Sequence, residues 1–107
     1  MAVPKRKRER NHMIIMAEIL ELARNPVLKT HIMYRVRMSY AQLMEYLKLL
    51  LGMKCLEVIQ DKESNRTAYR TTKQGLRYLT LYNEIKQLLS KYPIEEDSLL
   101  QVAEDRR

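Results

Sequence analysis

The chain lacks phenylalanine and tryptophan, and it has only one cysteine, two glycines and three prolines among 107 residues. The single cysteine, Cys55, excludes an intramolecular disulfide, and with only two histidines besides there is no structural zinc spacing. The scarcity of glycine and proline disfavours a sandwich or barrel, which needs many tight turns, and favours helices. No apolar run approaches the roughly 20 residues of a membrane span. Glu18 and Glu21 interrupt the apolar stretch nearest the start, so we expect no signal peptide and a small intracellular protein.

Positive charge is the main excess in the composition. Lys and Arg number 20 against 13 Asp and Glu, a formal net charge of +7, which indicates a polyanionic partner. Residues 1–10 carry five basic side chains and one acidic one, and we expect them to form a flexible basic arm. A solvated tail or an expression remnant is the alternative. The basic residues of this arm are Lys5, Arg6, Lys7, Arg8 and Arg10.

Apolar residues at intervals of three and four predict helices in the first half of the chain. Each expected helix follows a residue whose side chain commonly caps a helix N-terminus, and Pro26 ends the first of them. The predicted helices span residues 12–24, 31–36 and 40–51, with Asn11, Thr30 and Ser39 as their N-caps. Two short helices joined by so brief a turn are typical of a helix-turn-helix.

The apolar pattern then changes to that of a β-hairpin. Residues 55–60 and 67–71 are predicted strands around a polar turn, and a hairpin directly after a helix-turn-helix forms a wing. Thr72 is expected to cap a last helix, which Pro93 ends. The predicted fold class is mainly α with a small β-hairpin, a winged helix-turn-helix followed by a long C-terminal dimerisation helix. The expected parts are the basic arm (1–10), the winged helix-turn-helix domain (11–72), the long helix (73–92) and an acidic tail (93–107), with a short helix in this tail as one option.

The last predicted helix carries apolar groups on two faces. One set recurs at heptad spacing over about two heptads, which indicates a seam with a second helix and hence a homodimer. The other set, Leu76 and Leu79, is expected to close the core of its own domain. The alternative is a single broad face packed on that domain, although so small a domain has little core left to cover the distal half of the helix. The predicted dimerisation residues are Tyr78, Leu81, Ile85, Leu88 and Tyr92.

Several short motifs occur in the order found in a known family. They are Ile-Leu (19–20), Thr-His-Ile-Met-Tyr (30–34), Met-Ser-Tyr-Ala-Gln-Leu (38–43), Tyr-Leu (46–47) and Tyr-Arg-Thr-Thr-Lys-Gln-Gly (69–75). Over residues 12–92 the chain resembles small archaeal winged-helix DNA-binding proteins, which are chromatin-associated and dimerise through a long C-terminal antiparallel helix. The resemblance implies dimeric DNA binding.

One position departs from the pattern of that family. Lys54 stands near the place where the family has a glycine, and Gly52 comes two positions earlier. Glycine adopts the left-handed conformation of a helix cap at low cost, whereas lysine is strained in it. The helix over residues 40–51 is therefore expected to end early, near Gly52.

The second helix of a helix-turn-helix enters the major groove, where base edges can be read. Here Gln42 would reach adenine, Lys48 would meet a phosphate or a guanine, and phosphate would repel Glu45. Base readers are few, so we expect affinity mainly from phosphate contacts, with only a mild sequence preference. A wing arginine would enter the minor groove, and an ordinary solvated surface is the alternative for each of these side chains. The predicted DNA-binding residues outside the arm are Arg35, Arg37, Tyr40, Gln42, Lys48, Lys62, Arg66 and Arg70.

The sequence contains no recognisable catalytic constellation. Two glycines 23 positions apart cannot form a phosphate-binding loop, and Cys55 is expected to be a small core residue. We expect no enzymatic activity, cofactor, metal, membrane contact or small-molecule substrate. The predicted function is that of a homodimeric double-stranded DNA-binding protein, architectural or transcription-regulatory, in the cytoplasm at the nucleoid. The alternatives are a sequence-specific transcriptional repressor and a winged-helix module that binds protein or RNA.

Overall fold

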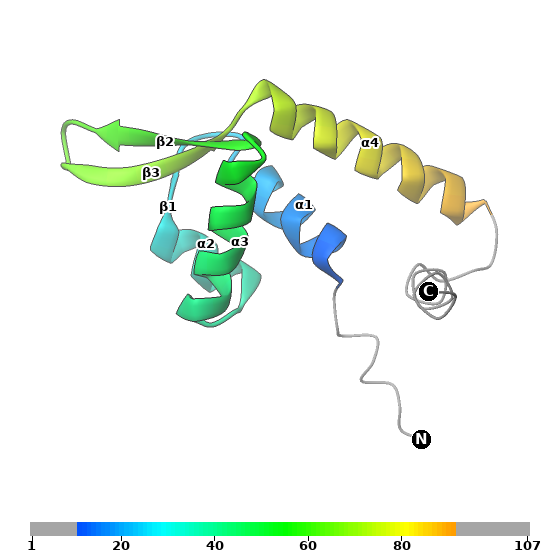
Figure 1. Cartoon of the computed structure of the whole chain (residues 1–107), viewed down its shortest axis with the longest axis horizontal. Helices are drawn as coiled ribbons and strands as arrows, with labels where there is room; N and C mark the ends of the chain where they lie inside the picture. The colour runs from blue at the N-terminus through cyan, green and yellow to red at the C-terminus, as the bar shows by residue number, and fades with distance from the viewer. Residues whose placement is uncertain (1–10, 92–107) are drawn as a thin grey trace, which may run out of the picture.

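The computed structural model describes residues 11–91, so the predicted basic arm, Tyr92 and the acidic tail lie outside the described residues. Within residues 11–91 the chain forms four helices and three strands, which Figure 1 shows. Their bounds are α1 His12–Leu22, β1 Val27–Leu28, α2 Lys29–Val36, α3 Tyr40–Gly52, β2 Leu56–Asp61, β3 Arg66–Thr71 and α4 Lys73–Ser90. The fold is a winged helix-turn-helix with a long C-terminal helix, which confirms the predicted fold class, while the dimerisation role of that helix stays a prediction.

Three of the helices begin where local side-chain caps were predicted. The side chain of Asn11 accepts a hydrogen bond from the backbone N–H of Ile14 at 2.9 Å. The hydroxyl of Thr72 accepts one from the backbone N–H of Gly75 at 3.1 Å. Ser39 caps α3 in the same way. Each cap provides a partner for a backbone donor that the first helical turn leaves unpaired.

The prediction that Thr30 caps α2 was wrong. The helix begins two residues earlier than predicted, at Lys29, and Leu28 occupies the cap position without any side-chain hydrogen bond. The reason is β1, a two-residue strand that the sequence analysis missed and that ends at this cap residue. Val27 pairs with Tyr69 of β3, so a contact distant in sequence sets the chain direction and the start of α2.

The three strands form one antiparallel sheet in the order β1-β3-β2. The two strands of the hairpin fall within one residue of their predicted bounds, and β1 adds a third strand against β3. Because β3 is central, its consecutive residues Ala68 and Tyr69 are both buried. The outer half of the hairpin extends past the helices as the wing (Figure 1).

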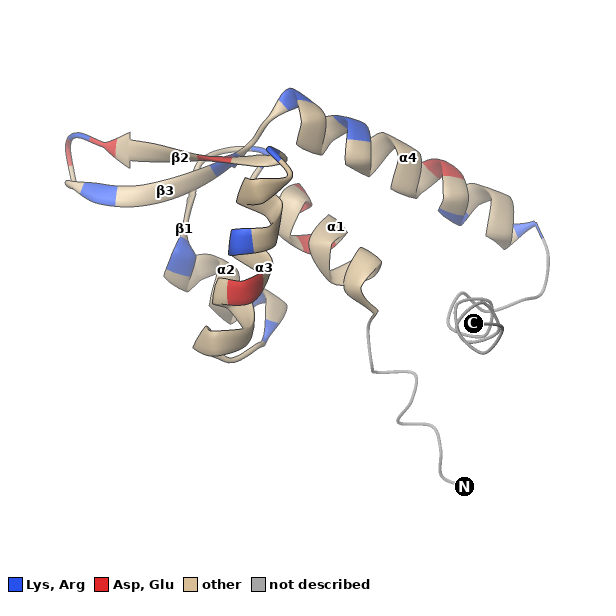
Figure 2. Cartoon of the chain, viewed as in Figure 1, with Lys and Arg blue, Asp and Glu red and all other residues tan. Residues whose placement is uncertain are grey.

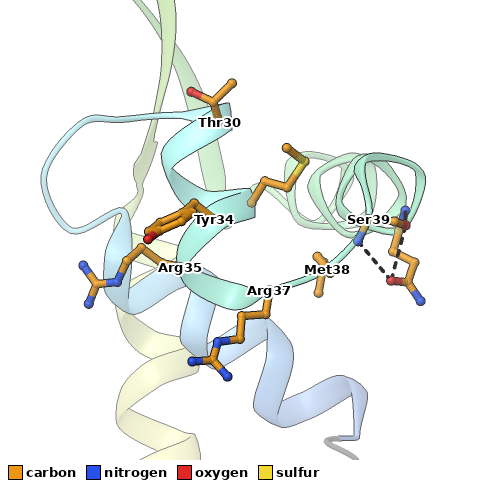
Figure 3. A pocket seen from close by; sticks show the side chains of 8 residues that line it. Thr30, Tyr34, Arg35, Arg37, Met38 and Ser39 are labelled. Atoms are coloured by element: carbon orange, nitrogen blue, oxygen red, sulfur yellow. Dashed lines mark hydrogen bonds between the residues drawn. The ribbon is translucent and has the colours of Figure 1, made fainter.

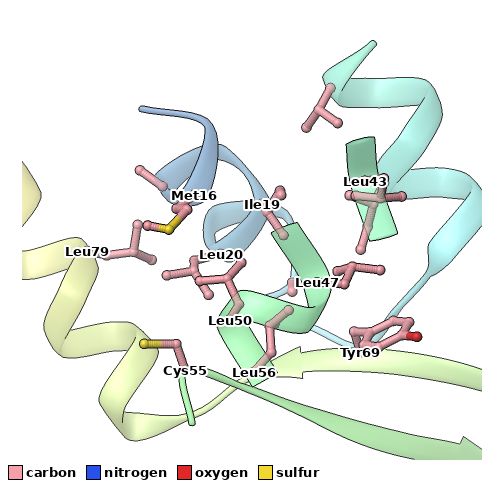
Figure 4. Close-up of a cluster of buried hydrophobic side chains, with 14 residues drawn as sticks. Met16, Ile19, Leu20, Leu43, Leu47, Leu50, Cys55, Leu56, Tyr69 and Leu79 are labelled. Atoms are coloured by element: carbon pink, nitrogen blue, oxygen red, sulfur yellow. The ribbon is translucent and has the colours of Figure 1, made fainter. Parts of the chain in front are cut away.

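The core lies where α1, α2 and α3 meet the base of the sheet. Apolar side chains from all three helices interdigitate there, and Leu79 of α4 closes one side (Figure 4). Cys55 is buried in this cluster, as predicted, and burial raises the pKa of its thiol. The fully buried large side chains are Ile19, Leu20, Ile32, Val36, Leu43, Leu47 and Leu50.

The end of α3 agrees with the departure noted in the sequence. The helix ends at Gly52, and Lys54 adopts the left-handed conformation with φ of 65°. Gly52 itself does not have a positive φ. The chain therefore places a lysine, and not its nearby glycine, at the position where the left-handed conformation is needed.

Candidate nucleic-acid interface

The outward face of α3 is the centre of the candidate interface. Burial of Leu43, Leu47 and Leu50 orients the opposite side of the helix to solvent. In Figure 2 the blue and the red part of α3 lie next to one another along the helix. Leu49, which is 47% exposed, was not among the predicted contact residues. The exposed residues of this face are Ala41, Gln42, Glu45, Lys48 and Leu49.

A reciprocal cap fixes the start of α3. The hydroxyl of Ser39 accepts a hydrogen bond from the backbone N–H of Gln42 at 3.2 Å. In return, the amide oxygen of Gln42 accepts from the backbone N–H of Ser39 at 3.3 Å. This is a capping box, in which one side chain at each position satisfies a backbone donor at the other. The oxygen of the predicted reader Gln42 is thus engaged within the protein, while its NH2 group has no such role in the cap.

The turn between α2 and α3 carries two arginines beside an open pocket. Arg35 lies in the last turn of α2 and Arg37 follows the helix, and within residues 11–91 neither forms an ion pair. Tyr34 is 81% exposed. Figure 3 shows both arginine side chains extending outward, with Tyr34 beside Arg35. The pocket is lined by Thr30, Met33, Tyr34, Arg35, Arg37, Met38, Ser39 and Gln42.

A lysine that the sequence analysis did not select lies against the predicted contact residue Tyr40. The Lys29 ammonium donates a hydrogen bond to the Tyr40 hydroxyl at 3.3 Å and sits 5.1 Å from the ring centroid. This geometry permits a cation–π attraction. Lys29 begins α2 and Tyr40 begins α3, so the pair joins the first turns of both helices of the helix-turn-helix.

The tip of the wing is held in shape by Asp61. Its carboxylate accepts hydrogen bonds from the Ser64 hydroxyl at 2.7 Å and from the backbone N–H of Glu63 at 3.2 Å. The hydrogen bond from Ser64 is the main cause that lowers the pKa of Asp61. This turn holds the predicted contact residues Lys62 and Arg66 at the exposed end of the hairpin. Within the described chain neither forms an ion pair within 4.0 Å, although the positive charge of Arg66 also helps to lower the pKa of Asp61, its partner across the strands.

Arg70, another predicted contact residue, is occupied within the wing. Its guanidinium contacts the Glu57 carboxylate at 2.7 Å from Nη2 and at 2.9 Å from Nε. The two residues are direct partners across β2 and β3. Both side chains are substantially exposed, so the pair adds little stability. It does reduce the positive charge that Arg70 presents to a ligand.

The predicted seam residues of α4 separate into two groups. Leu81, Ile85 and Leu88 are 46%, 43% and 56% exposed, and at helical spacing they form one apolar stripe. Tyr78 instead packs against its own domain, where its hydroxyl donates a hydrogen bond to the Met13 carbonyl at 2.9 Å. Burial is the main cause that raises the pKa of Tyr78 to about 12. Participation of these residues in a dimer remains a prediction.

Of the two leucines expected to close the core from α4, only one does so. Leu79 is buried, as predicted, whereas Leu76 is 39% exposed. The difference arises because α4 contacts the domain mainly through α1 and then extends away from it (Figure 1). The side of its first turn that carries Leu76 has no part of the core to cover.

The junction between β3 and α4 is tightly joined to the rest of the domain. The Thr71 hydroxyl donates to the Leu20 carbonyl at 2.7 Å, and the Thr71 backbone N–H donates to the Ala23 carbonyl at 2.7 Å. On the other side, the Thr72 hydroxyl donates to the Lys54 carbonyl at 2.6 Å. The end of α1 and the segment before β2 thus fix the direction in which α4 leaves the domain.

The sequence of the chain matches a family described as winged helix-turn-helix over residues 7–90. The chain belongs to this family. No curated protein matches the sequence.

Several solved structures resemble the fold of this chain. The DNA-binding protein Sso10a-2 from Sulfolobus solfataricus has a TM-score of 0.68 and 22% identity, over 92% of this chain and 98% of that chain. The transcriptional regulator PcaV from Streptomyces coelicolor, solved with its natural ligand, has a TM-score of 0.56 and 17% identity, over 85% and 70%. MepR of S. aureus, solved in complex with DNA, has a TM-score of 0.58 and 13% identity, over 94% and 76%. At these identities the likeness shows the fold.

Residues 11–91 of this winged helix offer no group of three or more His, Cys, Asp or Glu side chains that would hold a metal ion. In the same part of the chain, no helix is long and apolar enough to cross a membrane. What the described surface does offer is a set of exposed cations around α3.

Proposed function

We propose that the chain is a homodimeric double-stranded DNA-binding protein that places α3 in the major groove and the wing alongside it. The observation that carries this proposal is the arrangement of cations around the exposed face of α3. Two of them lie at the turn before α3, two lie at the tip of the wing and one lies on α3 itself. None has an ion-pair partner within 4.0 Å in the described chain. These cations are Arg35, Arg37, Lys48, Lys62 and Arg66.

The binding free energy in this proposal comes mainly from phosphate contacts. Each Lys or Arg that neutralises a phosphate releases condensed counterions, and this release depends on salt and not on base sequence. Tyr40 and Lys29 add polar groups at the start of the two helices of the helix-turn-helix, where helix-turn-helix proteins commonly contact the DNA backbone. The basic residues of segment 1–10 add to the same attraction.

Dimerisation follows in this proposal from the apolar stripe on α4. Leu81, Ile85 and Leu88 leave an apolar face uncovered on the half of α4 that extends away from the domain. Pairing with the same face of a second copy removes it from water. Two copies linked in this way present two α3 helices to one duplex, which raises the apparent affinity by effective concentration.

A salt titration tests the proposed DNA binding. Apart from Lys48, which lies on α3 itself, the four cations of the turn and the wing in each copy make eight phosphate contacts in a dimer, for which log affinity should fall against log salt with a slope of about −7. Fluorescence anisotropy with a labelled random duplex measures this slope. Binding that does not change with salt, or no binding to duplex DNA, would remove the proposal. Retention of binding in a variant without residues 1–10 would count against the alternative that the winged domain serves as a protein-binding or RNA-binding module.

Light scattering tests the proposed dimer. Wild-type protein should have twice the chain mass of 12.8 kDa, whereas Ile85→Asp should yield single chains, because it places a charge in the apolar face. Gln87→Asp is the matched control, since it adds the same charge to an exposed position on another side of α4. A dimer that survives Ile85→Asp would show that the stripe is not the interface.

The two named roles of such a protein, architectural and regulatory, differ in base selectivity. The similar solved structures are described as a DNA-binding protein and as a transcriptional regulator, and these descriptions do not decide between the two roles. A footprint confined to one palindrome would favour the regulator, and a similar affinity for many duplexes would favour the architectural role.

A further inference from the structure

An acidic residue occupies the middle of the surface that is proposed to enter the major groove. Glu45 lies on the outward face of α3, one turn from Ala41 and from Lys48. It is exposed and has no hydrogen bond or ion pair within residues 11–91. No part of the described fold therefore neutralises the carboxylate.

A carboxylate at this place opposes binding to DNA in general. Phosphates repel it, and a charged group that leaves water without a new partner raises the free energy of the complex. The penalty is relieved only where the carboxylate accepts a hydrogen bond from a base. In the major groove the amino groups of cytosine and adenine are the donors, and the adenine amino group lies beside the N7 acceptor. A group that only accepts therefore fits cytosine better than adenine.

The neighbours of Glu45 on the same face are donors. Lys48 follows three residues later, which along a helix is about 4.5 Å, close enough to the spacing of successive base pairs to reach the next pair. An ammonium donates to the O6 and N7 acceptors of guanine. On the other side of Glu45, the amide oxygen of Gln42 is engaged by the backbone of Ser39 at 3.3 Å, which leaves the Gln42 NH2 group as the donor. The face therefore presents a donor, an acceptor and a donor in order.

We propose that Glu45 makes α3 selective for a cytosine in the major groove, with a guanine favoured at the adjacent base pair beneath Lys48. This inference rests on the proposed DNA binding and goes beyond it, because that proposal requires only phosphate contacts. Glu45 is then a specificity residue: it weakens binding to most duplexes and is tolerated where a cytosine amino group meets it.

Selection from a pool of random duplexes, followed by anisotropy on single sequences, tests the role of Glu45. The wild-type protein should enrich cytosine at one position of each half-site and bind such a duplex about tenfold more tightly than one with another base there. Glu45→Gln should move the preference at that position from cytosine to adenine, because a glutamine amide both accepts and donates as adenine requires. Glu45→Ala should abolish the preference and bind random duplex more tightly than wild type.

Glu63→Gln is the matched control. It removes the same negative charge from the exposed wing turn, so it should strengthen general binding while the cytosine preference stays. A wild-type protein that binds duplexes but selects no cytosine, or a Glu45→Gln variant that keeps the cytosine preference, overturns this inference and leaves the proposed function standing. A wild-type protein that binds no duplex overturns both. Circular dichroism melts of each variant establish that the compared proteins are folded.

Discussion

Arg37 and Lys54 both occupy left-handed backbone conformations, with φ of 52° and 65°, and glycine substitution at each would separate stability from binding. A non-glycine residue in this region costs about 1–2 kcal/mol. Glycine removes that cost but loses about 0.5–1 kcal/mol through the greater freedom of the unfolded chain. Each of Arg37→Gly and Lys54→Gly should therefore raise the free energy of unfolding by about 0.5–1 kcal/mol, and the melting temperature by about 2–8 °C.

The effect on DNA binding should differ between the two variants. In the proposed complex Arg37 contacts a phosphate at the helix-turn-helix, and its loss removes two contacts per dimer, which reduces the salt slope by about 1.8. At 0.15 M salt this corresponds to about a thirtyfold loss of affinity. Lys54→Gly removes the same charge at the other end of α3, where the Lys54 carbonyl contacts Thr72, and its affinity should stay within a few-fold of wild type.

Thermal melts and salt-titrated anisotropy on one duplex measure both quantities. If Arg37→Gly stabilises the protein and binds DNA as tightly as wild type, then Arg37 does not contact a phosphate. If both variants melt at lower temperature, the assignment of strain to the left-handed conformation is wrong. Equal losses of affinity in both variants would show that net charge, and not position, determines binding.

Two further predictions concern the junction and the base of α4. Gly75→Ala should destabilise the protein by about 1–3 kcal/mol, because an added Cβ would lie 2.3 Å from the Cys55 carbonyl oxygen. The control Gly52→Ala should be neutral or stabilising, because its added Cβ meets nothing within 4 Å. Chemical denaturation measures the free energy of unfolding of both variants. Because folding raises the pKa of Tyr78 to about 12, the stability it contributes is fully present below about pH 10 and should be lost as the pH rises towards 12. Tyr78→Phe should remove this part of the pH dependence and, by losing the hydrogen bond to Met13, cost about 0.5–1.5 kcal/mol at neutral pH; an unchanged alkaline profile would contradict the assignment.

Elements with local signals could be predicted from the sequence. Asn11, Ser39 and Thr72 cap helices because the cap needs only residues two or three positions away. The inward leucines of α3 follow from helical periodicity alone. The early end of this helix at Gly52 was equally visible in the chain.

Features that depend on distant contacts could not be predicted in the same way. β1 has only two residues and exists because Val27 and Leu28 pair with β3, so no local pattern marks it. The pairing of Arg70 with Glu57 required the register of the hairpin. The capping role of Gln42 could have been predicted, because a glutamine three residues after Ser39 is the known spacing of a capping box. Gln42 was interpreted as a base reader because of its place on the exposed face of the helix alone.

The hydrogen bonds of Thr71 and Thr72 restrict the motion of the chain where α4 leaves the winged domain. Each winged domain and its α4 helix should therefore move together as one rigid body. In a dimer, the angle at which the two α4 helices cross would set the distance between the two α3 helices. A ligand that binds between the two α4 helices and changes their crossing angle would alter the fit to DNA without contacting the DNA-facing surface. The α4 pair would then be a site at which DNA binding can be regulated.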